Sequence, residues 1–554
     1  MKQIRTQLFF IYFILFSVKG LLAQELILEL TSNDQKESLI LKKIDYVKAH
    51  KDSITIRLEI NKVSEYLKNL GYFTNTVDKI EQVKTTYIAH FSLNSKTETA
   101  LIKVNSDSRI YVKEFKIINN TVSIPLHKLQ PTLYNISKQL DKEGKSFSKV
   151  QLHNISIQKD TLFANLNINK TKKRVINKVI IKGYEKFPKS YLKNYFNIGD
   201  STVFNQSKIE EIAKASKSIN FISIIKTPET LFTTDSTMVY LYFKKKESHS
   251  FDGIASFTTK EDGKVLFNGN VDLKLNNLLN KGEQFELFWN RIGEERQELR
   301  LSSKTPYILN SKFSPEISFS IYQQDSTFIN TNFHSRISYH IYPETQLAIS
   351  YHSESSENLK QNNVENVDTY NNSFIGLQFK YNIPKNDFFY NERLLIDINP
   401  SYGKRKIGQQ LLNQFKIEAT ASYLWDINFR NSIYIKNKTF HLNSSTFLYN
   451  ELYRIGGVSS IRGFNEQSIF SSSFSYFNME YRLLTSEKSY LYTITDIARV
   501  KTMTKNENLL GIGLGYLFTA KNSQINISSA LGRNSSKGFD FNQTKLTINW
   551  TNFF

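Results

Sequence analysis

The sequence predicts a fold class of α+β domains followed by an all-β transmembrane barrel of sixteen strands. Three observations support this prediction. The N-terminus carries an apolar segment that suits export, residues 25–246 mix helical and strand periodicity in a threefold repeat, and the chain alternates between apolar and polar residues from about residue 249 onward. With 554 residues, the chain is long enough for one large sheet and several smaller domains.

The N-terminal residues 1–23 predict a secretory signal peptide. Lys2 and Arg5 precede the apolar run LFFIYFILFSV, and we expect cleavage after Ala23. This run is shorter than the roughly 20 residues of a membrane-spanning helix, and no apolar stretch of that length follows it. A mature protein in a membrane would therefore be a barrel, because only helices and closed barrels satisfy their backbone groups in lipid.

Composition narrows the classes of function. The absence of cysteine excludes disulfides, thiolate metal sites and a cysteine nucleophile. The histidines are scattered, and no catalytic or phosphate-binding motif is present, so we expect no enzyme, no metal and no cofactor. The net charge of +21 comes with no nucleic-acid recognition motif. Solvated lysines explain this charge, with attraction to anionic lipid headgroups as the alternative.

Three phenylalanines mark the repeat of the first half: Phe73, Phe147 and Phe221, each 74 residues after the last. A helical pattern precedes each phenylalanine and a strand-like pair follows it. We therefore expect three small domains, over residues 24–104, 105–172 and 173–246, ahead of a barrel over residues 249–554. An α+β domain of no special function would show the same pattern.

The third copy is the clearest. VIIKGYEKFPKSYLKNYFNIGDSTVFNQSKIEEI and its flanks give the order strand, helix, helix, strand, strand. This stretch resembles the POTRA domain, the periplasmic module of outer-membrane assembly proteins, while the first two copies match it in the second helix and the adjoining strands. The resemblance implies that an open sheet edge within residues 222–243 captures client segments by strand addition.

The second half alternates in short segments such as EISFSIYQ, RISYHIY and QFKIEATA, which present one apolar and one polar face. About sixteen such segments fit a membrane barrel with a wet lumen, and aromatic residues, 13% of the chain, suit girdles at the two interfaces. A soluble β-sandwich or propeller is the competing interpretation.

The two ends of this half predict a lateral seam. SFDGIASFTT should pair with the final strand, TKLTINWTNFF. A glycine in the first strand adds no side-chain packing and should weaken the pairing. The predicted seam residues are Phe251, Gly253, Ile548, Trp550 and Phe554.

A glycine-flanked arginine interrupts the alternation in GGVSSIRGF, which we expect in the long loop between strands eleven and twelve. The motif resembles the sixth-loop signature of the BamA/TamA superfamily of outer-membrane insertases and translocators. The resemblance implies a loop lock formed by Gly456, Gly457, Ile461, Arg462, Gly463 and Phe464. It also implies that Arg462 pairs with two lumen acids, Glu480 in FNMEYRLL and Asp496 in LYTITDIA.

The same resemblance, nearest to TamA in module count, implies a factor that inserts or secretes client proteins through a laterally opening barrel. It places the barrel in the outer membrane of a Gram-negative bacterium and the N-terminal domains in the periplasm. The implied partners are unfolded outer-membrane or secreted proteins, outer-membrane lipids, and periplasmic or lipoprotein accessory subunits. The alternatives are a two-partner secretion translocator for one dedicated exoprotein and a passive diffusion pore.

Overall fold

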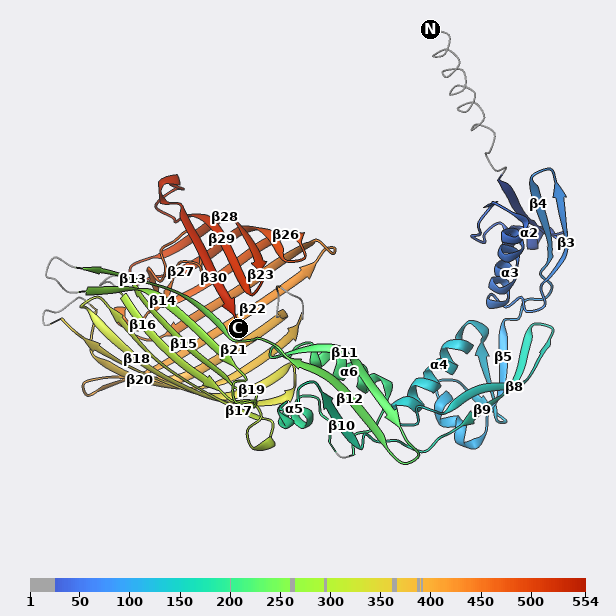
Figure 1. Ribbon diagram of the computed structural model, residues 1–554, viewed down its shortest axis with the longest axis horizontal. Coiled ribbons are helices and arrows are strands. Elements are labelled where there is room, and N and C mark those ends of the chain that lie inside the picture. The colour runs from blue at the N-terminus through green and yellow to red at the C-terminus, as the bar shows by residue number, and fades with distance from the viewer. Residues whose placement is uncertain are drawn as a thin grey trace, which may run out of the picture. The chain divides into compact units, whose positions relative to one another are not determined.

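The computed structural model describes residues 25–199, 201–259, 265–292, 296–360, 366–385, 389 and 392–554 (Figure 1). The predicted signal peptide, residues 1–23, lies outside the described residues. The chain divides into two compact units, Met1–Arg174 with Val203–Gln206, and Val175–Thr202 with Ser207–Phe554. The first unit holds two small sheets, and the second holds a third small sheet and a barrel.

The first sheet has the order β2-β1-β4-β3. Its strands are β1 (Leu26–Thr31), β2 (Ala49–His50), β3 (Thr76–Val83) and β4 (Thr86–Ser92), and its helices are α2 (Gln35–Leu41) and α3 (Ser53–Asn69). Helix α3 begins where the Asp52 side chain accepts a hydrogen bond from the Thr55 backbone N–H at 2.8 Å. Its buried side chains Ile56, Ile60, Val63 and Leu67 follow helical spacing and pack against the sheet.

The second sheet has the order β6-β7-β5-β9-β8. Its elements are β5 (Thr99–Lys103), η2 (Ser106–Val112), β6 (Ile117–Ile118), β7 (Thr121–Pro125), α4 (Leu126–Lys142), β8 (Lys149–Gln158) and β9 (Thr161–Asn169). Strand β5 pairs with β7 and β9, so the expected boundary at residue 104 falls after the first strand of this sheet. The change of sheet lies between β4 and β5 instead.

The third sheet has the order β10-β12-β11. It comprises β10 (Lys178–Lys182), α5 (Lys189–Asn194), α6 (Gln206–Ser216), β11 (Ile222–Phe232) and β12 (Thr237–Lys245). Its core is aromatic: the Phe187 ring lies 5.3 Å from Phe243 and 6.1 Å from Phe221, centroid to centroid. Because β12 is the central strand, only the β11 part of the segment 222–243 forms an open edge.

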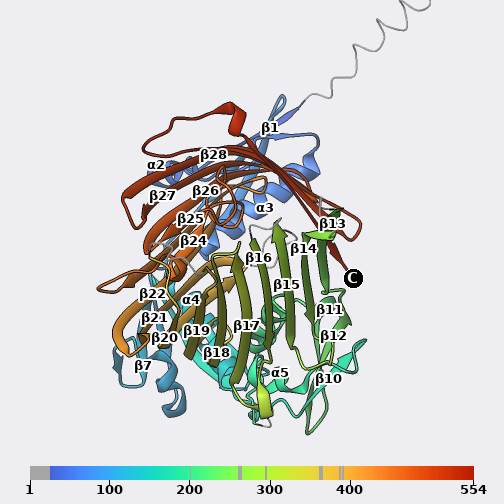
Figure 2. The ribbon, with the colours of Figure 1, turned by 90° about the vertical axis from the view of Figure 1, so that its left-hand side faces the viewer.

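A closed antiparallel barrel of sixteen strands follows (Figures 1 and 2). Its strands are β13 (Ser250–Thr259), β14 (Val265–Asn276), β15 (Gln284–Ile292), β16 (Arg296–Lys304), β17 (Phe313–Gln324), β18 (Phe328–Tyr342), β19 (Thr345–Asn358), β20 (Tyr370–Pro384), β21 (Glu392–Ile407), β22 (Gln410–Asp426), β23 (Asn431–Asn443), β26 (Ser473–Ser486), β27 (Ser489–Lys501), β28 (Asn506–Ala520), β29 (Ser523–Arg533) and β30 (Lys545–Phe553). The predicted fold class, small α+β domains followed by a sixteen-stranded barrel, is confirmed.

The barrel wall is apolar outside and polar inside. Large apolar side chains stand exposed on the outer face, such as Ile337, Ile349 and Leu377, each more than half exposed. Polar groups at alternate positions are buried on the inner face, among them Ser338, Ser350 and Gln378. This is the side-chain alternation of a barrel that faces lipid. Among the described residues, no helix has the length and apolar character needed to span a bilayer.

Aromatic and polar contacts join the third domain to two turns of the barrel. The Tyr191 ring of α5 lies edge-on to Tyr307, 5.1 Å between centroids, in the turn before β17. In the turn between β14 and β15, the Tyr184 hydroxyl donates to Asn280 Oδ1 at 2.6 Å and accepts from Asn277 Nδ2 at 2.7 Å. Burial raises the pKa of the Tyr191 phenol far above its ordinary value, so the contact stays uncharged.

Candidate functional site

The loop between β23 and β26 is the candidate site. It joins strands eleven and twelve of the barrel, as predicted, and contains η4 (Tyr449–Glu451) and a short hairpin of β24 (Tyr453–Ile455) and β25 (Ile469–Ser471). Figure 2 shows both hairpin strands within the ring of barrel strands. The loop and the wall together line a polar cavity of about 430 Å³, the wall contributing residues such as Lys416 and Lys438. The loop therefore folds into the lumen.

Glycines shape the tip of the loop. Gly456 and Gly457 have φ values of +110° and +88°, which L side chains rarely adopt. They begin a tight turn in which Gly457 N–H donates to the Ile461 carbonyl at 3.0 Å. The Glu466 carboxylate closes the turn by accepting from the Val458 N–H at 2.9 Å. This turn presents Arg462 to the wall.

The structure brings Arg462 together with both predicted acids. Its Nε donates to Asp496 Oδ2 at 2.8 Å, and its Nη2 donates to Asp496 Oδ1 at 2.6 Å. Its Nη1 donates to Glu480 Oε1. Glu480 lies on β26 and Asp496 on β27, so one guanidinium joins two neighbouring strands. The planar fork of arginine suits this double recognition of carboxylates.

A second arginine balances the charge of the cluster. Arg482 Nε donates to Glu480 Oε2 at 2.8 Å, which gives two cations for two carboxylates. Asp496 is 0% exposed, Glu480 8% and Arg482 7%. Buried charges are tolerated when they are paired and hydrogen-bonded. Arg482 follows Glu480 in the quoted motif, but the sequence did not indicate that it shares the carboxylate.

The residues beside Arg462 seat the loop by packing. Ile461 is completely buried in an apolar cluster with Phe474, Tyr476 and Ala498, and Phe464 packs against its edge. Gly463 has a φ of +90°, and a Cβ atom there would lie 2.4 Å from the Leu531 carbonyl carbon of β29. The absence of a side chain is what allows this close approach. All six residues of the predicted loop lock thus lie in one docked segment.

Known proteins resemble this chain in structure but not in sequence. No protein-family profile matches the chain, and no curated protein matches it in sequence. CdiB from Acinetobacter baumannii is 13% identical with a TM-score of 0.52, and CdiB from Escherichia coli is 13% identical with a TM-score of 0.51; each covers 89% of this chain and 97% of its own. The chain shares the fold of CdiB. The structure of BamA from Haemophilus ducreyi lacking POTRA domains 1–3 is 14% identical with a TM-score of 0.45, and the match covers 83% of this chain and 99% of that one.

The seam between the first and last strands is short. Among the described residues, the backbone pairing of β13 with β30 is limited to Ser250 with Phe553 and Phe251 with Asn552. Phe554 extends the contact, since its N–H donates to the His249 carbonyl at 2.9 Å. By contrast, β13 pairs with β14 along its whole length, from Ser250 to Thr259.

Of the five predicted seam residues, the structure therefore brings together only those at the end next to the third domain. Gly253 pairs with Val271 of β14, not with β30. Ile548 and Trp550 pair with Ile527 and Ile525 of β29. The alternation of apolar and polar residues specifies neither the register between the two strands nor the residue at which their pairing ends.

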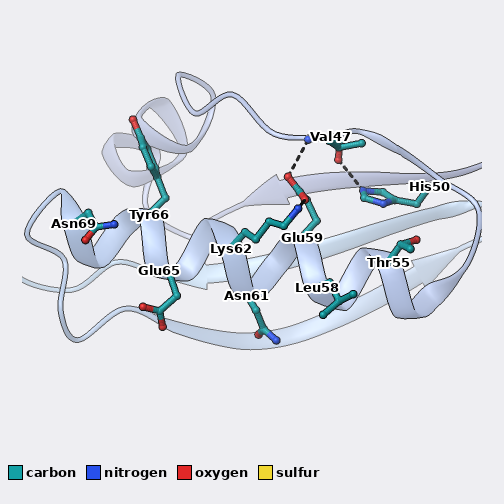
Figure 3. Close-up of a pocket in the computed structure, with 10 residues that line it drawn as sticks. All are labelled: Val47, His50, Thr55, Leu58, Glu59, Asn61, Lys62, Glu65, Tyr66 and Asn69. Atoms are coloured by element: carbon teal, nitrogen blue, oxygen red, sulfur yellow. Dashed lines mark hydrogen bonds and ion pairs between the residues drawn. The ribbon is translucent and has the colours of Figure 1, made fainter. Parts of the chain in front are cut away.

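A groove of about 700 Å³ lies on the first domain, between α3 and the segment before β2 (Figure 3). Two of its polar side chains, Glu59 and His50, contact the Val47 backbone. Glu59 accepts from the Val47 N–H at 3.1 Å and pairs with Lys62 at 3.0 Å, and His50 Nε2 lies 2.7 Å from the Val47 carbonyl oxygen. Leu58 adds an exposed apolar side chain to the groove.

Metal-binding geometry is missing from the part of the chain that the structure describes, where no three His, Asp or Glu side chains cluster closely enough to hold an ion. What the Arg462 cluster can do is mechanical. It fixes a loop in the lumen by charge-assisted hydrogen bonds.

Proposed function

We propose that this protein assembles or translocates other proteins at the outer membrane of a Gram-negative bacterium. The observation that carries the proposal is the Arg462 cluster inside a sixteen-stranded barrel whose first and last strands barely pair. The barrel would lie in the outer membrane with the three small domains in the periplasm. The apolar outer face of the barrel supports this location.

The short seam supports a mechanism of lateral opening. Two residue pairs and the backbone hydrogen bonds between His249 and Phe554 hold the ends of the sheet together, so parting them breaks few backbone hydrogen bonds. An opened seam exposes unpaired strand edges, which bind an extended client strand readily. Because no nucleotide is available outside the cell, the free energy would come from folding of the client in lipid.

The soluble domains would deliver the client. β11 forms an open edge of the third sheet, and its backbone groups can add a further strand with little sequence preference. The exposed Ile225 and Leu231 on this strand offer apolar contact to the client side chains. Three such domains favour a TamA-like assembly factor. Accessory subunits in the periplasm would bind the same domains.

The second candidate is a two-partner secretion translocator, which would export one dedicated protein through the same kind of barrel. Two observations favour the assembly factor. The chain has a third small domain, and among the described residues a loop, not an α-helix, lies within the lumen. A passive diffusion pore is the least supported function, since a docked loop occupies the lumen.

Depletion of the protein, followed by quantitative proteomics of the outer membrane, tests the proposal. An assembly factor predicts loss of many barrel proteins. Loss of a single secreted protein would establish the dedicated translocator instead. An outer-membrane and secreted proteome that stays unchanged after depletion would refute both.

A further inference from the structure

A second buried ion pair lies away from the Arg462 cluster. Arg405 on β21 pairs with Glu451 in η4, at the start of the lumen loop. The side chain of Arg405 is 1% exposed and that of Glu451 is 3% exposed. No sequence motif indicated this pair.

Both charged groups have further partners. Arg405 Nη2 donates to Thr446 Oγ1 at 2.6 Å, and its Nη1 donates to the Thr446 carbonyl oxygen at 3.2 Å and to the Glu451 carboxylate. Gln414 Nε2, on β22, donates to Glu451 Oε1 at 2.6 Å. The arginine therefore holds two points of the loop, residues 446 and 451, against the same part of the wall.

Asn450 extends this attachment to three more strands. Its Nδ2 donates to Ser356 Oγ on β19 at 2.6 Å. Its carbonyl oxygen accepts from Asn330 Nδ2 on β18 at 2.7 Å and from the Tyr370 hydroxyl on β20 at 3.2 Å. Five consecutive strands, β18 to β22, thus hold residues 446–451.

We propose that Arg405 and Glu451 form a second anchor of the lumen loop, independent of Arg462. The Arg462 cluster holds the tip of the loop at β26 and β27, whereas the second anchor holds its base at β18–β22. The segment between the anchors, residues 452–461, lines the cavity in the lumen. Arg405 and Glu451 are positioning residues, and their importance for client passage rests on the proposed function.

The burial of the pair determines what its loss would do. Removing one partner leaves the other charge buried and unpaired, which is strongly unfavourable in the docked state but not in a released, hydrated one. The base of the loop should therefore leave the wall while Arg462 keeps its own carboxylates. Its release would widen the passage through the barrel.

Double electron–electron resonance on the full chain in lipid nanodiscs tests the anchor. The chain has no cysteine, so labels can be attached through Ser445→Cys, in the base of the loop, and Ser536→Cys, two exposed positions. Arg405→Ala and Glu451→Ala should each broaden the distance distribution. They should also raise the rate of proteolysis within residues 444–451 by about a hundredfold, the effect expected when a buried pair loses one member. The charge reversal Arg405→Glu with Glu451→Arg should restore the narrow distribution in large part.

Arg393→Ala is the matched control, because Arg393 lies on the same strand and pairs with Asp426 while its side chain is 49% exposed. It should change neither readout. If Arg405→Ala does not fold, Glu451→Gln removes the charge with little change in shape. Unchanged distances and proteolysis in every variant that folds would overturn the second anchor. These readouts need no client, so failure of the purified protein to assemble clients would refute the proposed function and leave the anchor standing.

Discussion

Arg462 makes three hydrogen bonds to a single carboxylate, that of Asp496. The backbone N–H of Arg462 donates to Oδ2 at 2.8 Å, the side-chain Nε donates to the same oxygen at 2.8 Å, and Nη2 donates to Oδ1 at 2.6 Å. The backbone and the side chain of Arg462 thus bind the same carboxylate. The loop is fixed in position and in orientation, which a single ion pair would not achieve.

Arg462→Ala should release the tip of the loop and leave the barrel folded. The substitution leaves the buried Asp496 with only the backbone contact, so docking of the loop should weaken by about 3–5 kcal/mol. Arg462→Lys should rescue docking only in part, because an ammonium lacks the planar fork. Limited proteolysis of residues 456–470 measures the release, and heat-modifiable migration on gels reports barrel folding. Equal protease resistance of wild type and Arg462→Ala would show that Arg462 does not hold the loop.

Gly511→Ala should displace the same loop from the opposite side of the contact. A Cβ atom at Gly511 of β28 would lie 2.2 Å from the Arg462 carbonyl oxygen, closer than any real contact allows. We expect a loop as protease-sensitive as in Arg462→Ala. Gly538→Ala is the control, since a Cβ there meets nothing within 4 Å and should leave the loop docked. A docked loop in Gly511→Ala would mean that the backbone of the loop does not pass this close to the wall.

Gly282→Ala should loosen the third domain from the barrel. Gly282 has a φ of +79°, and a Cβ atom there would lie 2.4 Å from the Tyr191 ring. We expect faster hydrogen exchange in α5 and in the β14–β15 turn, with the barrel strands unaffected. Gly199→Ala, in the same domain but in open space, should exchange as the wild type does. Identical exchange in the two variants would contradict a fixed contact between Tyr191 and this turn.

Sequence patterns predicted the elements but few of the contacts between them. Period-two alternation specified the strands, because a strand between lipid and lumen needs one apolar face. The glycines and the arginine that break this alternation marked the loop, whereas the two acids of the Arg462 cluster were implied by the resemblance of that loop to a known signature. Arg405 and Glu451 were missed because each sits in an ordinary polar segment, and only the closure of the barrel brings residues 46 positions apart together. The extent of the seam depends likewise on strand register, which alternation leaves open.

Acid should weaken the packing of α3 in the first domain. Burial acts to raise the pKa of Glu59, but the hydrogen bond from the Val47 N–H and the ion pair with Lys62 outweigh it and hold the pKa below its usual value of 4.5. A lowered folded-state pKa contributes stability above pH 4.5, and this contribution is lost as the pH falls through the folded-state value. Hydrogen exchange of α3 between about pH 7 and about pH 3, corrected for intrinsic rates, measures this loss.

Glu59→Gln removes the titrating carboxylate, so its α3 should lose protection less steeply in acid than the wild type does. Glu65→Gln is the control, because Glu65 pairs with Lys68 on the same helix with its side chain 70% exposed. The same pH profile in the wild type and in Glu59→Gln would exclude Glu59 as the source of the acid sensitivity.

The most direct test of the account is client folding in liposomes that carry a lockable seam. Phe251 and Asn552 are paired residues across the seam, so Phe251→Cys with Asn552→Cys allows a disulfide to close it in a chain that has no other cysteine. We predict that the reduced protein accelerates folding of an unfolded outer-membrane barrel over empty liposomes, and that oxidation abolishes the acceleration while the protein stays folded. Assembly through an opening seam would be contradicted if liposomes with the reduced protein folded the client no faster than empty liposomes do. It would also be contradicted if complete oxidation left the acceleration undiminished.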